Sequence, residues 1–303
     1  METAVISTRG LTKAFGSRLA VDDLSFEVPA GRVTGFLGPN GAGKTTTMRM
    51  VLGLARATSG VATVWGRPYA ELDQPWRRVG VMLDPASVHP RRTARDHLRW
   101  MVAAAGIGTQ RVDQVLETVG LGQAGDRKVG EFSLGMRQRL GLAAALLGEP
   151  ELLILDEPAN GLDPAGIRWL RELLRSFVGD GGAVFLSSHL LAEVAQMADE
   201  VVVVQDGRLV AHTSVEALTV GAARAVRVRS PEADRLADLL LAAGAEVRTG
   251  APGAMRVLGV GPEQVGVMAA QAGVVLHELV GESESLEDVF FELTKEDNHA
   301  RIG

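Results

Sequence analysis

The sequence predicts an α/β protein in two parts, a large domain on a mainly parallel sheet followed by a small α+β domain. The 303 residues are too many for one ordinary domain and too few for three. Strand and helix patterns alternate as far as about residue 214, which indicates parallel strands covered by helices on both faces. A glycine-rich loop between a buried strand and a helix lies in the first part.

The first domain is predicted over residues 1–220, and its elements follow from hydrophobic periodicity and turn residues. The pattern between 93 and 139 is mostly helical, with glycine breaks at 106–108 and 120–125, and it predicts a helical insert. The expected strands are 4–8, 24–28, 32–37, 61–64, 79–83, 152–155, 183–187 and 201–205, and the expected helices are 45–54, 164–177 and 190–198.

The second domain is predicted over residues 221–303. Its order is strand, helix, strand, strand, helix, strand, at 225–229, 232–243, 246–249, 255–259, 262–272 and 274–280. That order is the split β-α-β arrangement of ferredoxin-like domains. The alternative is an extended helical tail.

Composition excludes several classes of protein. Apolar residues make up 46% and charged residues 22%, as in folded globular chains. No apolar run reaches the roughly 18 to 20 residues of a membrane span, and no secretory signal is visible. With no cysteine, we expect a cytoplasmic chain without disulfides. The net charge of −6 argues against nucleic-acid binding.

The glycine-rich loop has the form G-x-x-x-x-G-K-[ST] in the strand-to-helix context that this motif requires. Its glycines let backbone N–H groups surround phosphate oxygens, and the helix N-terminus adds positive potential. Lys44 is expected at the β and γ phosphates, and the Thr45 hydroxyl at Mg²⁺. The predicted nucleotide-binding residues of the loop are Gly38, Pro39, Asn40, Gly41, Ala42, Gly43, Lys44, Thr45 and Thr46.

Two carboxylates end the apolar strand at 152–155, at the edge where ligands of open α/β sheets bind. Asp156 is expected to hold Mg²⁺ directly or through water, and Glu157 to polarise the attacking water. The alternative is that the pair caps the next helix.

The stretch FSLGMRQRL, residues 132–140, resembles the signature sequence of the ATP-binding cassette (ABC) family, and the resemblance covers residues 4–220. It implies a P-loop NTPase fold of the ABC type, with an antiparallel β subdomain beside the parallel sheet. It also implies a homodimer that encloses two ATP molecules. Ser133, Leu134, Gly135 and Met136 would then act in trans on the γ phosphate held by the other subunit.

Other positions match the family at the expected places. Phe15 resembles the aromatic residue that stacks on adenine, with Val21 beside it, although a lone Phe is more often part of a core. Asp163 lies in a segment, residues 160–163, that resembles the D-loop, and the resemblance implies that it organises the contact between the two subunits. His189 resembles the histidine that contacts the γ phosphate and holds the attacking water together with Glu157; a single His after a strand is otherwise an ordinary loop residue.

The chain departs from the family at two positions. Leu134 stands where the signature usually has glycine, so a side chain is added where close approach is needed. Asp84 stands where a glutamine usually contacts the metal. We expect Asp84 to remain a metal or water ligand, because a carboxylate binds Mg²⁺ more strongly than an amide oxygen does.

The resemblance implies an ATPase that drives a separate membrane permease and is held by it at the inner face of the cell membrane. The segment 85–98 resembles the part that docks on the permease, although its Arg91, Arg92 and Arg95 also fit a solvated face. The end of the chain, with 285–293, resembles ATPases of the drug and antibiotic resistance exporters. The expected cargo is therefore a hydrophobic drug, antibiotic or lipid. The alternative is a soluble ABC ATPase that acts on ribosomes or DNA.

Overall fold

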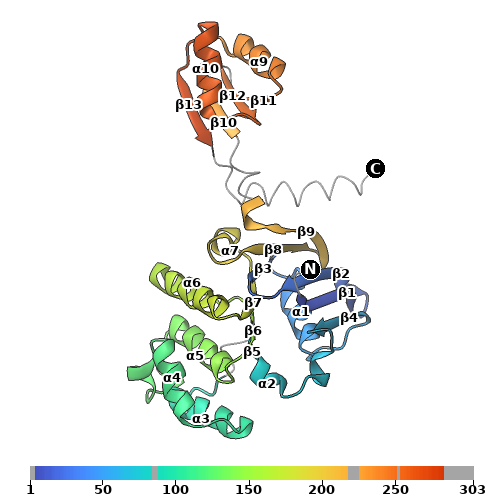
Figure 1. The fold of residues 1–303 in the computed structure, drawn as a ribbon, viewed down its shortest axis with the longest axis vertical. Helices are drawn as coiled ribbons and strands as arrows, with labels where there is room; N and C mark the ends of the chain where they lie inside the picture. Colours follow the sequence, from blue (N-terminus) through green and yellow to red (C-terminus); the bar gives the residue numbers. More distant parts are fainter. Residues whose placement is uncertain (1–3, 84–87, 218–224, 251–252, 283–303) are drawn as a thin grey trace. The chain divides into compact units, whose positions relative to one another are not determined.

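The computed structural model describes residues 4–83, 88–217, 225–250 and 253–282 (Figure 1). The chain divides into two compact units, Met1–Thr213 and Ser214–Gly303, whereas the sequence analysis begins the second domain at residue 221. The predicted fold class is confirmed, because the first unit combines a mainly parallel sheet with an antiparallel sheet and a helical insert. No helix in the described ranges is both long and apolar enough to cross a membrane.

The main sheet of the first unit has the strand order β5-β6-β7-β3-β8-β9. The strands β5, β6, β7, β3 and β8 are parallel, and every residue of β3, β6 and β7 is buried, as expected for strands covered on both faces. Their bounds are β3 Val33–Leu37, β5 Val79–Met82, β6 Leu152–Leu155, β7 Ala183–Ser188, β8 Glu200–Gln205 and β9 Arg208–Ser214.

The strand β9 is not among the sequence predictions. It follows β8 through Asp206 and Gly207, which have φ angles of 50° and 80°. An Asp-Gly pair is the residue pair that a two-residue hairpin turn prefers, because both of its residues adopt left-handed backbone. The Asp206-Gly207 dipeptide is therefore a signal in the sequence that predicts a hairpin, with β9 as its second strand.

The antiparallel sheet has the order β2-β1-β4, with bounds Ala4–Phe15, Arg18–Pro29 and Ser59–Val64. The strands β1 and β2 each have 12 residues, more than the sequence analysis predicts. Their register shifts between Thr8 and Leu11 and again between Leu11 and Lys13. Such irregularities break the alternation of polar and apolar residues on which strand prediction depends.

The helices α1, α6 and α7 position the strands of the main sheet. The ring centroids of Phe26, Phe36 and Phe185 lie 5.2 to 5.6 Å apart in the core shared with α1 and the antiparallel sheet. Gly35, which precedes Phe36 and faces the other way, leaves room for Val194 of α7. The bounds are α1 Lys44–Val51, α6 Pro164–Gly179 and α7 Leu191–Met197.

The helical insert is confirmed, but its last helix runs on to Leu146 rather than ending at 139. Arg95 ion-pairs with Asp126 at 2.8 Å and with Asp113, so this arginine joins parts of the insert rather than belonging to a solvated face. The helices are α2 Pro75–Arg78, which precedes the insert, and α3 Ala94–Ala105, α4 Gln110–Thr118 and α5 Leu134–Leu146 within it.

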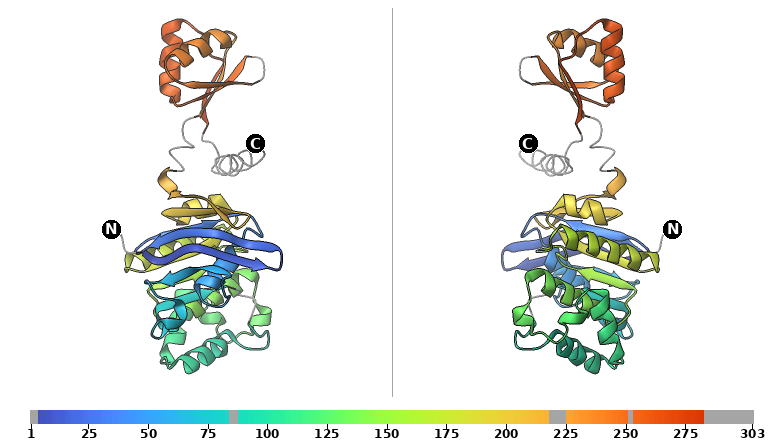
Figure 2. Two further views of the ribbon diagram at one scale, coloured as in Figure 1. Left: turned by 90° about the vertical axis from the view of Figure 1, so that its right-hand side faces the viewer. Right: turned by 90° about the vertical axis from the view of Figure 1, so that its left-hand side faces the viewer.

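The second unit is ferredoxin-like, as predicted. Its antiparallel sheet has the order β11-β12-β10-β13, and α9 and α10 pack against each other and against the sheet (Figure 2). The last strand begins four residues later than predicted, because Gly273 ends α10 in a left-handed conformation and the next residue, Val274, is buried in the core. The bounds are β10 Ala225–Arg229, α9 Ala233–Ala242, β11 Glu246–Thr249, β12 Ala254–Leu258, α10 Pro262–Ala272 and β13 Glu278–Glu282.

Gly80 in β5 sets how closely α5 approaches the main sheet. A Cβ atom at this position would lie 2.3 Å from the carbonyl oxygen of Ala145, a backbone atom that cannot rotate away. We therefore expect Gly80→Ala to lower the free energy of unfolding by about 1 to 3 kcal/mol. Urea unfolding followed by tryptophan fluorescence measures this change. Gly179→Ala is the control, because nothing lies within 4 Å of the added atom there, and equal midpoints for both variants would contradict the prediction.

Candidate active site

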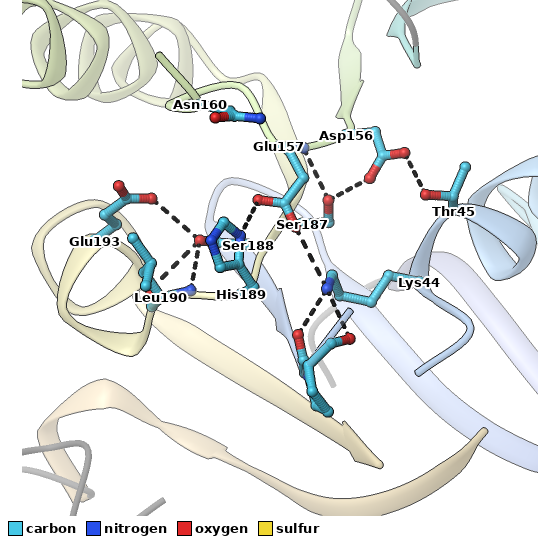
Figure 3. Close-up of polar contacts among 12 residues, drawn as sticks. Lys44, Thr45, Asp156, Glu157, Asn160, Ser187, Ser188, His189, Leu190 and Glu193 are labelled. Carbon is cyan, nitrogen blue, oxygen red and sulfur yellow. Dashed lines mark hydrogen bonds and ion pairs between the residues drawn. The ribbon is translucent and has the colours of Figure 1, made fainter. Parts of the chain in front are cut away.

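Three neighbouring strands end at the site. In the sheet β6 pairs with β7, and β7 pairs with β3, so the loops after their carboxyl ends meet. These loops carry Lys44, Asp156 and Glu157, and His189, which the structure brings together as predicted (Figure 3). The N–H of Gly38 donates to the carbonyl of Ser188 at 3.3 Å and ties the first loop to the third.

The loop after β3 needs its glycines. Gly41 and Gly43 have φ angles of 84° and 98°, in the left-handed region. A Cβ atom on Gly43 would also lie 2.3 Å from the carbonyl oxygen of Ala20. The chain can therefore fold into a tight loop that delivers Lys44 as the first residue of α1.

Lys44 lies almost entirely inside this loop, with 6% of its surface exposed. Its ammonium donates to the carbonyls of Gly38 at 2.6 Å and Pro39 at 3.2 Å. A buried ammonium with these partners places a fixed positive charge where the motif predicts phosphate oxygens.

A cavity of about 470 Å³ lies beside the loop. At its edge Phe15 exposes 58% of its surface, and the ammonium of Lys13 lies 5.0 Å from the ring centroid. An exposed aromatic ring at the edge of a cavity suits stacking on a base. The residues around the cavity are Phe15, Arg18, Ala20, Asn40, Gly41, Gly43, Lys44, Thr45, Thr46 and Glu157.

Val21 and Ala42 do not line this cavity among the described residues. Val21 is fully buried in the core below the loop, and Ala42 exposes only 4% of its surface. The residues of β2 that line the cavity are Arg18 and Ala20. Neighbouring side chains of a strand point to opposite faces. Ala20 therefore lines the cavity, while Val21, the next residue of β2, points into the core.

The carboxylate of Asp156 joins two elements. Thr45 Oγ1 donates to one of its oxygens at 2.6 Å, and Ser187 Oγ donates to the other. Asp156 is 7% exposed, and these hydrogen bonds offset the cost of burying its charge. The alternative role as a helix cap does not hold, because α6 begins at Pro164 with Asp163 as its N-cap.

Glu157 has a φ angle of 50°, in the left-handed region that a non-glycine residue rarely occupies. Such a conformation costs about 1 to 3 kcal/mol and persists where the surroundings hold it. Its N–H donates to Ser187 Oγ at 2.9 Å, and its carbonyl accepts from Gln138 Nε2 at 3.3 Å and from the N–H of Asn160 at 3.1 Å.

The carboxylate of Glu157 lies between two nitrogen groups. Oε1 is 3.3 Å from Lys44 Nζ, and Oε2 is 2.8 Å from His189 Nδ1. A neutral imidazole that donates Nδ1–H to this carboxylate keeps Nε2 as an acceptor, and only the imidazolium donates from both nitrogens. The carboxylate therefore has the contacts of a base that a cation and a histidine hold in place.

The loop of His189 is held by local hydrogen bonds. Ser188 Oγ accepts from the N–H of Leu190 at 3.0 Å and donates to Glu193 Oε2 at 3.2 Å (Figure 3). Bonds of this kind between a serine and the backbone two residues later fix the course of a short loop. His189 is thus presented by a fixed loop.

The signature turn and the D-loop touch each other within the chain. Ser133 is the N-cap of α5 and accepts from the N–H of Met136 at 3.2 Å. Leu134 is 49% exposed, and its side chain covers Gly161, where an added Cβ atom would lie 2.1 Å from it. Asp163 Oδ1 accepts from the N–H of Gly166 at 2.7 Å at the start of α6.

Two features of the sequence analysis fall outside the described residues. Asp84 lies in 84–87, and the expectation that it binds a metal or water stays a prediction. The segment 285–293 lies beyond the last described residue, 282.

Residues of the site that are absent from the sequence predictions include Arg18, Ala20, Gln138 and Ser187. A signal existed for Gln138, which lies on the same face of α5 as the buried Leu142 and Ala145, four and seven residues later. A buried polar residue on an apolar helix face needs a partner. No comparable signal marks Ser187, which depends on strand register.

Comparison with known proteins shows which families this chain resembles. The model of the ABC transporter family matches residues 21–160, and that of a domain of unknown function, DUF8746, matches residues 224–287. The bacitracin transport ATP-binding protein BcrA of Bacillus licheniformis is 45% identical over 210 residues, 68% of this chain and 69% of the relative. The lantibiotic transport ATP-binding protein SrtF of Streptococcus pyogenes is 37% identical over 206 residues, 68% of this chain and 89% of the relative.

A solved ATP-binding subunit of an ABC transporter superposes with a TM-score of 0.64 at 27% identity, over 71% of this chain and 92% of that one. A nucleotide-free cassette of an ABC transporter, at 22% identity and a TM-score of 0.62, supports the fold alone. The match of the family model includes Lys44, Asp156 and Glu157, and the resemblance to the ABC family is confirmed. The chain therefore belongs to the ABC transporter family, as an ATP-binding subunit that hydrolyses ATP.

Proposed function

We propose that two copies of this chain close on two MgATP molecules and reopen after hydrolysis, and that this motion drives a separate membrane permease that exports an antibiotic, a hydrophobic drug or a lipid. The dimer is proposed because one subunit supplies only part of the expected ATP site. The cavity around Lys44 is lined from one side by the phosphate loop, Phe15 and Glu157. The described lining contains none of the signature residues 133–136. A second subunit would supply them.

The donor set at Asp156 suits Mg²⁺. Thr45 Oγ1 and the Asp156 carboxylate offer two hard oxygen ligands that are already adjacent. Mg²⁺ usually takes one or two protein ligands of this kind and completes its shell with phosphate oxygens and water. The bound cation would neutralise charge on the phosphates, and the same two residues would hold it.

The hydrolytic roles follow from the contacts of Glu157. Its carboxylate would accept a proton from the attacking water, and His189 would hold that carboxylate and contact the γ phosphate. Lys44 would exchange its contact with Glu157 for phosphate oxygens when ATP binds, because a phosphate group carries more negative charge than one carboxylate. Phe15 would stack on the adenine.

The class of cargo is inferred from the relatives, and the export direction from the resemblance to ATPases of the drug and antibiotic resistance exporters. BcrA and SrtF are named for bacitracin transport and lantibiotic transport. Both matched regions cover 68% of this chain. Their names refer to peptide antibiotics, so export of an antimicrobial peptide is the first cargo class to test. We place the chain at the cytoplasmic face of the membrane, held there by the permease.

The soluble alternative, action on ribosomes or DNA, has less support. The net charge of −6 offers no general attraction for nucleic acid. No nucleic-acid partner is therefore included in the proposal.

Co-expression of the chain with a candidate permease, sought among the reading frames next to its own, tests the transport proposal. Cells that carry both are expected to tolerate a higher concentration of bacitracin or of a lantibiotic than cells that carry either one alone. The matched control is the same pair with Lys44→Ala, which keeps the permease and removes the phosphate-loop cation. Co-purification of the two proteins without any gain in tolerance would keep the permease partner and reject this cargo class.

Glu157→Gln separates binding from hydrolysis. The amide keeps the shape of the side chain but cannot accept the proton, so we expect the turnover number to fall by at least about 100-fold while ATP still binds. Size-exclusion chromatography with ATP and Mg²⁺ is expected to show a dimer. Turnover at the wild-type rate would remove Glu157 from the role of base, and a monomer at all ATP concentrations would count against the dimer.

Asp163 has a structural role in the chain besides the contact proposed across the dimer. Loss of the cap in Asp163→Ala is expected to lower the free energy of unfolding by about 1 kcal/mol, whereas Asp163→Asn keeps an acceptor and is expected to lose less. Urea unfolding measures both variants. If the dimer contact depends on the carboxylate, Asp163→Asn weakens ATP-dependent dimerisation although it remains stable, and equal dimerisation would reject that contact.

A further inference from the structure

Both backbone polar groups of Glu157 are met by side chains from other elements. The N–H donates to the hydroxyl of Ser187, the fifth residue of β7. The carbonyl accepts from the amide of Gln138 in α5. Neither side chain is among those that line the cavity beside Lys44.

These contacts decide where the carboxylate of Glu157 points. When the N–H and the C=O of one residue are both held, its φ and ψ angles are held, and so is the direction of its Cα–Cβ bond. At a φ of 50°, Glu157 leaves the extended course of β6, and its carboxylate meets His189 Nδ1 and Lys44 Nζ. Relaxation to an ordinary backbone conformation would turn the side chain elsewhere.

Ser187 connects the two carboxylates of the site. Its hydroxyl has one hydrogen, which it donates to Asp156 Oδ1, and a lone pair of the same oxygen accepts the N–H of Glu157 (Figure 3). The residue is completely buried, so water does not compete for either bond. One side chain thus fixes the carboxylate beside Thr45 and the backbone of Glu157 together.

Gln138 spans the turn that follows Glu157. Its Nε2 donates to the carbonyls of Glu157 and Asn160, at 3.3 and 2.9 Å, the first and last residues of that turn. Two carbonyl acceptors fix the orientation of the amide, and its Oε1 is then buried without a hydrogen-bond partner among the described residues. An unsatisfied acceptor lowers stability, so the benefit of this glutamine lies in the geometry of the turn.

We propose that Ser187 and Gln138 are positioning residues that hold the Glu157 peptide in its left-handed conformation and so aim the carboxylate at the attacking water. The inference rests on the proposed role of Glu157 as the base. It adds that two buried side chains outside the cavity set the rate of the chemical step. It also predicts that replacing Gln138 leaves ATP affinity unchanged, because among the described residues this side chain donates only to the carbonyls of Glu157 and Asn160. Ser187 also donates to Asp156, so its replacement is expected to affect Mg²⁺ as well.

Gln138→Met gives the clearest test. Methionine fills a similar volume, removes both N–H donors and also removes the buried acceptor. We expect kcat of the full-length chain to fall about 10- to 100-fold, with the Kd for a fluorescent ATP analogue and the melting temperature unchanged. Gln114→Met, the same change at an exposed position of α4, is the control and keeps the wild-type kcat.

Ser187→Ala tests the second residue. It is expected to lower kcat to a similar extent and to raise the Mg²⁺ concentration needed for half-maximal activity, because Asp156 also loses its donor. Ser187→Thr restores the hydroxyl and is expected to recover part of the activity. Thr34→Val is the control, since the Thr34 hydroxyl lies buried in the neighbouring strand β3 with no hydrogen-bond partner among the described residues.

The outcomes separate this inference from the proposed function. If Glu157→Gln leaves a small measurable kcat, and Gln138→Met lowers kcat in the wild type but does not lower this residual kcat further, the positioning role is supported. If Gln138→Met and Ser187→Ala keep kcat within twofold of the wild type while Glu157→Gln is inactive, the positioning role is wrong and the base remains. If kcat falls only in step with melting temperature and ATP affinity in both variants, their role is structural. If Glu157→Gln turns over normally, the base assignment fails first.

Discussion

The buried carboxylate of Asp156 is the constraint on which the site depends. A charge this deep in the protein is tolerated only with hydrogen-bond donors around it, and they come from Thr45 in α1 and Ser187 in β7. The parallel register supplies them, because Leu155 pairs with Leu186 and Ser187 pairs with Phe36. Any shift between these strands would leave the charge without a donor, so the ionised carboxylate and the strand register support each other.

Backbone strain is found at Glu157, the residue after Asp156. Asp206 has the same φ angle as Glu157, but it lies in an Asp-Gly turn, where left-handed backbone is the rule. Glu157 follows a buried strand and has no such local reason. Strain of this kind is retained where surrounding contacts outweigh it, and those contacts come from a strand and a helix that are distant in sequence. The strain therefore lies at Glu157, the residue whose side-chain direction the proposed hydrolysis depends on.

The sequence could identify four charged or ionisable side chains of the site, because their positions follow from local rules. Lys44 is fixed by the motif that contains it, and Asp156 and Glu157 are placed by the end of an apolar strand. His189 also follows a strand, and parallel strands end at one edge of the sheet. These four residues, from three widely separated segments of the chain, could therefore be assigned to one place.

The residues that the sequence analysis missed depend on relations between elements. Ser187 acts through the register of β7 against β6, and Gln138 through the face that α5 turns towards the sheet. Val21 was expected beside the adenine but is buried in the core, because the register of β2 turns Ala20 to the cavity instead. One-residue differences in strand facing cannot be read from composition or periodicity alone.

The leucine of the signature turn is explained by its neighbour. Leu134 covers Gly161, where any added side chain would clash with it. The large side chain on the signature turn is therefore accommodated by a glycine in the D-loop. Four residues further along α5, Gln138 holds the carbonyls of Glu157 and Asn160. The helix that begins at the signature turn thus contacts the segment from Glu157 to Gly161 at two places. A displacement of the signature helix would be transmitted to Glu157 through these contacts. In the proposed dimer, the half-site that a subunit offers to its partner would therefore move together with the half-site that holds its own ATP.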